Sequence, residues 1–247
     1  MGNEIKMYFS HHKPIYVILA AIMIGCGLQY FILSNENMKS VQDALSEESE
    51  SLIFQSFSVD IIALIALLYY IFCSAASIMK DGVFEKNKST RKMILHKIYA
   101  SYLFVFICNG IIVLSTSIIV IILYGFHHDI FYHALLLLIA KSYTAIFYVT
   151  LSMFLAVLFK KYMFIFTILF VVEIAKIAVF AFLRKFAVFD YVIFNHLDIS
   201  SYFHLPSSGI DKGYNILFSI AIYLAYIFLL QALSVYIFNK KRERVTD

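Results

Sequence analysis

Charged residues stand at three points inside long apolar runs of this 247-residue chain, where charge is costly and often functional. Glu173 and Lys176 are three residues apart, so a helix would place them on one face, where they could form an ion pair. Lys141 has no acidic residue within one helical turn in the sequence, so its partner must come from another helix, a lipid headgroup or water. We expect these three side chains to form structural ion pairs or to line a transport pathway.

Motifs for catalysis, nucleotide binding and metal binding are absent from the sequence. It contains no GxxxxGK[ST] loop, no HExxH or GxSxG pattern and no paired-cysteine metal motif. His128 and His133 could share a site across a short outer loop, and the alternative is a solvated position at the membrane surface. We therefore expect a protein that is not an enzyme, has no cofactor of its own and does not bind nucleic acid.

The composition indicates a protein whose surface meets lipid. Apolar and aromatic residues make up 62% of the chain, and charged residues make up only 15%. A soluble domain of this size is typically about half apolar and about a quarter charged. One hydrophobic core could not bury this excess, so we expect an integral membrane protein.

Six segments contain the roughly 20 apolar residues that a helix needs to cross the roughly 30 Å hydrocarbon core of a membrane. Backbone groups cannot stay unpaired in lipid, so each segment is expected to be a helix. The segments are residues 14–33, 58–79, 99–124, 131–159, 162–182 and 214–238. They predict an all-α fold with a single six-helix transmembrane domain over residues 1–247. Asp60 falls near the outer start of the second span, where we expect it to contact water.

Small and polar residues within the spans are expected to serve helix packing. Ala21 and Gly25 are four residues apart, which gives the first span a face that another helix can approach closely. The third span carries Asn109, Gly110 and the run 115–117 of serine and threonine, for which we expect the same role.

Lysine and arginine concentrate on the cytoplasmic side of membrane proteins, and this bias predicts the orientation of the spans. With the N-terminus inside, fourteen of the twenty lysines and arginines lie in inner segments and four lie in outer ones. The outer four are Lys39, Arg184, Lys185 and Lys212. The distribution predicts that both ends of the chain are cytoplasmic.

The first inner loop, residues 80–97, is basic and interrupted by apolar residues such as Phe84. Thr90 could cap a helix that begins near Arg91. A short, amphipathic, basic helix in this position could dock into a groove on a partner protein. The alternative is that these charges only follow the positive-inside rule and bind anionic lipid.

The order of these parts resembles the permease subunits of ABC type-2 transporters. A short N-terminal segment, residues 1–13, precedes the first span, and a long apolar outer segment, residues 183–213, precedes the sixth. In sequence, the resemblance is carried by the inner loop between Asp81 and Lys97, which reads acidic-Gly, Phe-Glu-Lys, Ser-Thr-Arg-Lys and His-Lys.

In that family, two six-helix permeases pair, as identical or related chains, and each engages a separate ATPase subunit that binds ATP and Mg. The resemblance implies that residues 80–97 form the coupling loop, 1–13 a connecting helix and 183–213 a re-entrant segment that seals the pathway. Substrate would pass between the two copies near the second and fifth spans. The residues then placed at or near the ATPase are Phe84, Glu85, Lys86, Ser89, Thr90, Arg91 and Lys97.

The resemblance implies the permease subunit of an ATP-driven exporter in the bacterial cytoplasmic membrane. Small permeases of this kind in low-GC Gram-positive bacteria often export peptides, among them lantibiotics and phenol-soluble modulin toxins. The acidic first outer loop, residues 34–57, and the aromatic-rich helices would suit amphipathic, often cationic peptides, and would suit other substrates too. Two alternatives stay open: a non-transporting immunity or sensor protein that binds peptides, and a proton-driven secondary transporter that uses Glu173, Lys176 or Lys141.

Overall fold

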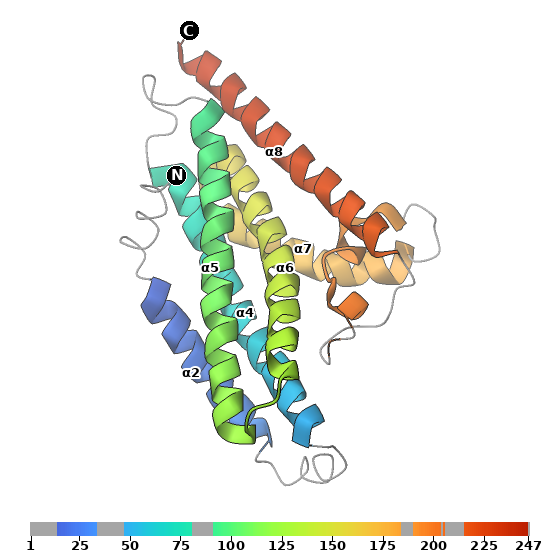
Figure 1. Cartoon of the computed structure of the whole chain (residues 1–247). Helices are drawn as coiled ribbons and strands as arrows, with labels where there is room; N and C mark the ends of the chain where they lie inside the picture. The colour runs from blue at the N-terminus through green and yellow to red at the C-terminus, as the bar shows by residue number, and fades with distance from the viewer. Residues whose placement is uncertain are drawn as a thin grey trace.

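Helices make up almost all of the chain that the structure describes. The computed structural model describes the backbone of residues 14–33, 47–80, 91–183, 190–203, 205 and 215–246, and the side chains of 16–25, 27, 51–79, 93–175, 190–203, 205 and 215–241. No strand occurs in these ranges, so the predicted all-α fold is confirmed for them. The elements in Figure 1 are α2 (Pro14–Leu33), α4 (Glu47–Lys80), α5 (Arg91–Tyr124), α6 (Asp129–Phe159), α7 (Tyr162–Leu183), the 3-10 turns η2 (Ile193–Asn195) and η3 (Ser200–Phe203), and α8 (Ile216–Thr246).

Four of these helices are long and apolar enough to cross a membrane, which makes the chain compatible with a membrane protein. They contain the stretches Ser51–Met79, Met93–Tyr124, Asp129–Phe159 and Ile216–Lys241. The first and fifth predicted spans also form helices, α2 and α7. Their described apolar stretches are shorter, Tyr16–Gly25 and Tyr162–Ala175, so a crossing by these two stays a prediction.

Two helices begin well before the predicted spans. α4 begins at Glu47, eleven residues before the predicted start, and α5 begins at Arg91, eight residues before. In the first turns of α4, the polar side chains of Ser51 and Gln55 are buried inside the bundle. Polar residues that face other helices and find hydrogen bonds there are tolerated in membrane helices. A criterion that selects only apolar runs therefore places these two helix starts too late.

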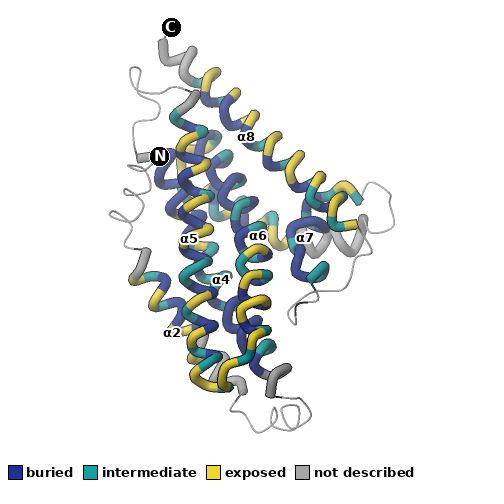
Figure 2. The backbone as a smooth tube through the Cα atoms, viewed as in Figure 1, coloured by how far each residue is buried: buried dark blue, intermediate teal, exposed yellow. Residues whose placement is uncertain are grey.

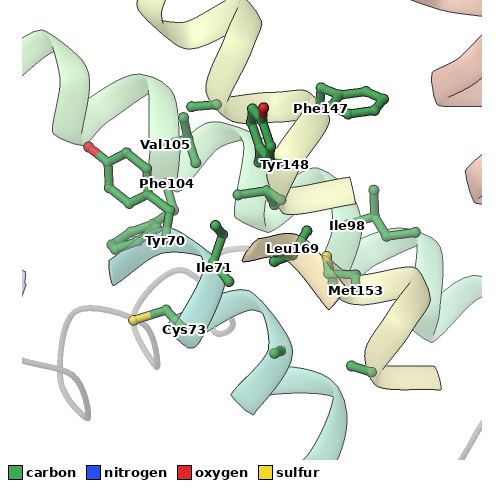
Figure 3. Packing of buried hydrophobic residues seen from close by; sticks show 14 of the residues in the cluster. Tyr70, Ile71, Cys73, Ile98, Phe104, Val105, Phe147, Tyr148, Met153 and Leu169 are labelled. Atoms are coloured by element: carbon green, nitrogen blue, oxygen red, sulfur yellow. The ribbon is translucent and has the colours of Figure 1, made fainter. Parts of the chain in front are cut away.

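The core lies where α4, α5 and α6 pack against one another. Figure 3 shows its aromatic part, in which the Tyr70 ring of α4 meets the Phe104 ring of α5 edge to face, with centroids 5.9 Å apart. Met153 of α6 and Leu169 of α7 belong to the same buried cluster. Such edge-to-face pairs are a preferred arrangement of aromatic rings. These three helices form the frame that positions the polar groups described below.

A face of small residues brings α2 against α4. Ala21 and Gly25 are buried, and a Cβ atom added to Gly25 would lie 2.3 Å from Cγ1 of Ile62. The predicted packing role is therefore confirmed for this pair, because only glycine permits so close an approach. A Cβ on Gly110 of α5 would meet nothing within 4 Å in the described part of the chain, so its predicted packing role finds no partner there.

The helices α7 and α8 are less enclosed than α4, α5 and α6. In Figure 1, α7 runs across the direction of α5 and α6, and α8 leans away from them. Within Tyr162–Ala175 the buried side chains are Ile165 and Leu169, which form a narrow stripe one turn apart. Figure 2 shows exposed positions along α8, where 22% of the residues in an 18-residue apolar segment are buried, against 61% in the corresponding segment of α6. Much of the surface of these two helices is therefore available to lipid or to another protein.

Basic residues from separate segments meet at one end of the bundle, which is uppermost in Figure 1. Lys241 of α8 donates from Nζ to the backbone oxygens of Val157 and Leu158, at 2.8 and 2.6 Å, and so ties the end of α8 to the end of α6. Lys97 of α5 donates to the backbone oxygen of Ser77, near the end of α4. One end of the bundle is therefore basic, as the predicted inner side requires.

Candidate functional site

A pocket of about 260 Å³, lined by charged, polar and apolar residues, lies between α4, α5, α6 and the segment that carries η2 and η3. Three charged residues line it, Asp60, Lys141 and Asp198. Asn109 also lines it and stands at the middle of the apolar stretch Met93–Tyr124 of α5. The pocket therefore lies at the depth of the helix centres, where charged groups are most costly and most often functional.

Lys141 and Asp60 form an ion pair that joins α6 to α4. Of the partners foreseen for Lys141, the structure therefore shows an acidic residue on another helix. Asp60 was expected near the outer start of a span, but α4 extends well before it; the contact of Asp60 with water stays a prediction. α4 begins at Glu47, so Asp60 lies thirteen residues, or about 20 Å, from the first residue of this helix. Its side chain is 28% exposed and that of Lys141 is 21% exposed, as befits a pair in a pocket wall.

Neutral polar groups complete the wall, and hydrogen bonds hold them in place. The Tyr70 hydroxyl donates to Oδ1 of Asn109 at 2.9 Å, and Nδ2 of Asn109 donates to Oγ of Ser142 at 3.2 Å. Oγ1 of Thr144 donates to the backbone oxygen of Leu197 at 2.8 Å. Each of these bonds joins two different elements. Asn109 was expected to help helices pack closely. The structure shows that it instead joins them through interhelical hydrogen bonds.

Asp198 contributes its carboxylate from the outer segment. Its Oδ1 accepts the backbone N–H of Ser200 at 2.9 Å and also the hydroxyl of Ser200. The segment is anchored by His196, whose Nδ1 lies 2.8 Å from Oγ of Ser219 on α8. Among the described residues, the carboxylate of Asp198 meets these neutral donors and no cation.

The other two charges predicted within spans lie on α7, away from the pocket lining. Glu173 is exposed, and the Tyr148 hydroxyl of α6 donates to its carboxylate. The side chain of Lys176 lies outside the described residues, so the ion pair expected between the two stays a prediction. Of the two charges whose side chains are described, Lys141 and Glu173, Lys141 is the one that lines the pocket.

The predicted ATPase-contact residues fall mostly outside the described chain. Arg91 is the first residue of α5, where a helix start was expected, but the helix is not short, since it continues to Tyr124. Lys97 is 2% exposed and donates to Ser77 of α4, so its ammonium faces the bundle. The residues outside the described ranges are Phe84, Glu85, Lys86, Ser89 and Thr90.

A second buried polar cluster joins the early turns of α4 and α6 to the later turns of α5. Nε2 of Gln55 donates to Oγ of Ser117 at 2.8 Å. Nδ1 of His133 lies 2.8 Å from Oε1 of Gln55, and its Nε2 lies 3.2 Å from Oγ of Ser56. His128 is exposed. The two histidines therefore do not share a site, and the solvated position expected for His133 is wrong.

Sequence reasoning finds Lys141 but does not connect it to Asp60 or Asp198. Charge matching could have found Asp60, because a lysine without a local acid needs an acid on another span. Asp198 carries no such signal, since the outer segment has no helical periodicity that would indicate which of its residues face inward.

The described lining of the pocket combines two carboxylates, one ammonium and neutral hydrogen-bonding groups, which can bind a polar ligand. Among the described residues, no group of three or more His, Cys, Asp or Glu side chains could hold a metal ion. Its formal charge of about −1 favours cations over anions.

Comparisons of the chain with protein families, with curated proteins and with solved structures find no match.

Proposed function

We propose that this chain is the transmembrane permease subunit of an ATP-binding-cassette exporter in the bacterial cytoplasmic membrane. In this proposal six helices cross the membrane with both chain ends in the cytoplasm. A second permease copy completes the path, and a separate ATPase subunit binds ATP and Mg. The cargo is an amphipathic peptide. The four long apolar helices and the basic end of the bundle support this assignment.

The connection between the inner loop and the pocket is the observation that carries the proposal. Residues 81–90 connect α4 to α5, and Lys97 in the early turns of α5 ties this helix to Ser77 near the inner end of α4. Ser74, one turn before Ser77, shares a hydrogen bond with Ser152 of α6 at 2.7 Å. A force on the loop would therefore reach α4, α5 and α6 together, and these helices line the pocket. Energy-coupled transport needs such a link between an ATPase contact and a binding site.

Co-purification with an ABC ATPase encoded beside this chain tests the proposal. We expect a stable complex and a higher rate of ATP hydrolysis with the permease than without it. Arg91→Glu and Glu85→Lys should each weaken the complex or its ATPase stimulation. The control Lys39→Glu, on the predicted outer side, should change neither. Full binding and stimulation in both loop variants would show that the loop does not couple to the ATPase.

The Asp60–Lys141 pair favours a second candidate, a secondary transporter driven by protons. Ionisable residues inside membrane helices often form proton relays in such proteins. Uptake of a labelled cationic peptide into inside-out vesicles separates the two candidates. Uptake that needs ATP and survives collapse of the proton gradient supports the exporter. Uptake that needs the gradient and no ATP supports the secondary transporter.

A further inference from the structure

We propose that the pocket lined by Asp60, Lys141 and Asp198 binds a single primary ammonium group on an alkyl stem, such as a lysine side chain. The inference rests on the proposed function for its biological role, since it specifies which part of a peptide cargo the permease holds. Binding itself requires only this chain.

The charge balance of the pocket favours a cation. Asp60 and Lys141 neutralise each other as an ion pair. The carboxylate of Asp198 accepts hydrogen bonds from the backbone and hydroxyl of Ser200, which are neutral. Among the described residues, one carboxylate is therefore left without a counter-ion at the depth of the helix centres. A bound cation would compensate this charge, which a membrane protein otherwise keeps at high cost.

The size and the apolar lining favour a narrow alkyl stem. The volume of about 260 Å³ lies below the roughly 300–1,000 Å³ of sites for drug-sized ligands. One side chain fits this volume better than a whole peptide. The lining also includes Ala63, Leu64, Leu67 and Ala145. These residues can contact methylene groups while an ammonium head reaches Asp198, in the manner of amphipathic lysine side chains.

The hydrogen-bonding groups of the pocket suit an ammonium more than an anion or a metal ion. An ammonium has three N–H donors and no acceptor. Oδ1 of Asn109 accepts one bond, from Tyr70, and an amide oxygen can accept two. An anion would meet the carboxylates of Asp60 and Asp198 and be repelled by their charge. Asp60 already holds an ammonium of this kind, that of Lys141.

Binding can be measured with the purified full-length chain in lipid nanodiscs, without an ATPase. Calorimetry or ligand-observed NMR would compare butylammonium with 1-butanol, a neutral probe of the same length. We expect butylammonium to bind at least about tenfold more tightly, as a charge-assisted hydrogen bond provides. Equal binding of the two probes would overturn the proposal. A second arm compares Ala-Lys-Ala with Ala-norleucine-Ala: preference for the lysine peptide identifies a peptide source, and binding of butylammonium alone identifies a free amine.

Substitutions can shift the pocket charge in both directions. Asp198→Asn removes the uncompensated carboxylate and should weaken butylammonium binding about tenfold. Lys141→Met leaves two uncompensated carboxylates and should strengthen it. The double variant Asp60→Asn/Lys141→Met leaves one uncompensated carboxylate, that of Asp198, as in the unaltered chain. Its affinity for butylammonium should therefore return towards that of the unaltered chain, and this test holds even if Lys141→Met alone folds poorly. Asp129→Asn, on α6 outside the pocket lining, is the matched control and should change nothing.

Opposite shifts in Asp198→Asn and Lys141→Met support the ammonium site. Shifts in the same direction, or no shift, overturn it, because a purely structural role would lower binding in both variants. The outcome is separable from that of the ATPase experiment. If no ATPase binds the chain, the exporter assignment fails and the ammonium site stands; if no ammonium binds, the coupling of the inner loop is unaffected.

Discussion

The bundle of α4, α5 and α6 and the outer pair of α7 and α8 are held in place differently. In an 18-residue apolar segment of α6, 61% of the residues are buried, and in that of α8, 22% are buried. Within the bundle, hydrogen bonds such as that between Ser74 and Ser152 join buried side chains of different helices. α8 is joined to it by side chains spaced along its length, including Gln231, which donates to the Tyr102 hydroxyl at 2.9 Å, and Lys241. Packing from several sides thus determines the arrangement of the bundle, whereas α8 is held along one face, by buried residues such as Phe238 and by a few polar contacts.

Membrane physics explains why such a division is tolerated. Lipid tails are about as apolar as leucine, so exposed apolar side chains are not penalised as they would be in water. Phe228 of α8, for instance, is 62% exposed. Helices that lack extensive packing then depend on polar contacts for their position.

The largest expected effect comes from removing a core aromatic ring. Phe104 of α5 is 1% exposed, so Phe104→Ala should lower the free energy of unfolding by about 3–5 kcal/mol, through lost contacts and the cavity that remains. Phe228→Ala removes the same atoms from the exposed face of α8 and should cost less than about 0.5 kcal/mol. Thermal unfolding in nanodiscs measures both. Similar losses for the two variants would contradict the division between bundle and outer pair.

The contact between α2 and α4 gives the next largest effect. Gly25→Ala places a Cβ 2.3 Å from Ile62 and should destabilise the chain by about 1–3 kcal/mol, because one helix must move. Gly110→Ala is the matched variant, since its Cβ would meet nothing within 4 Å. It should be neutral or stabilising by about 0.5–1 kcal/mol, as alanine favours helix. A loss of stability in Gly110→Ala would indicate that a second chain covers this face of α5.

The helices could be predicted from the sequence to a large extent, because length and apolarity alone decide what crosses a membrane. The predicted first span, residues 14–33, has the same bounds as α2. The starts of α4 and α5 could not be predicted this way, since their first turns carry polar or charged residues that tertiary contacts satisfy. Lys97 is an example. The sequence predicts it to be a solvated charge in a loop, yet its ammonium donates a hydrogen bond to the backbone oxygen of Ser77 inside the bundle.

The candidate site was only partly predictable, because a pocket depends on which helix faces meet. Lys141 stands out in the sequence as a charge without a local partner. Its pairing with Asp60 depends on the rotation of α4 and α6 about their axes, and the uniformly apolar spans do not determine that rotation. Asp198 enters the pocket through the fold of the outer segment, which His196 anchors by a side-chain hydrogen bond to α8.

A smaller effect is expected from the buried polar cluster of the bundle. Gln55→Leu removes hydrogen bonds to Ser117 and His133 and should cost about 1 kcal/mol, in the range known for interhelical hydrogen bonds in membranes. A double-mutant cycle of Gln55→Leu with His133→Leu isolates the shared bond, since both variants remove it. Strictly additive losses in unfolding free energy would show that these two side chains do not interact.

The smallest expected effect concerns the tie between α8 and the bundle. Lys241→Met removes the donor to the backbone oxygens of Val157 and Leu158, and its cost to global unfolding should stay below about 0.5 kcal/mol, because the rest of α8 keeps its contacts with the bundle. The end of α8 should nevertheless open more often, so its amide hydrogens should exchange faster while those of α5 stay protected. Lys240→Met, the exposed neighbour, is the control and should change neither. If exchange in Lys241→Met rises equally in α5 and α8, the two open as one cooperative unit, and α8 belongs to the bundle rather than to a separately held outer pair.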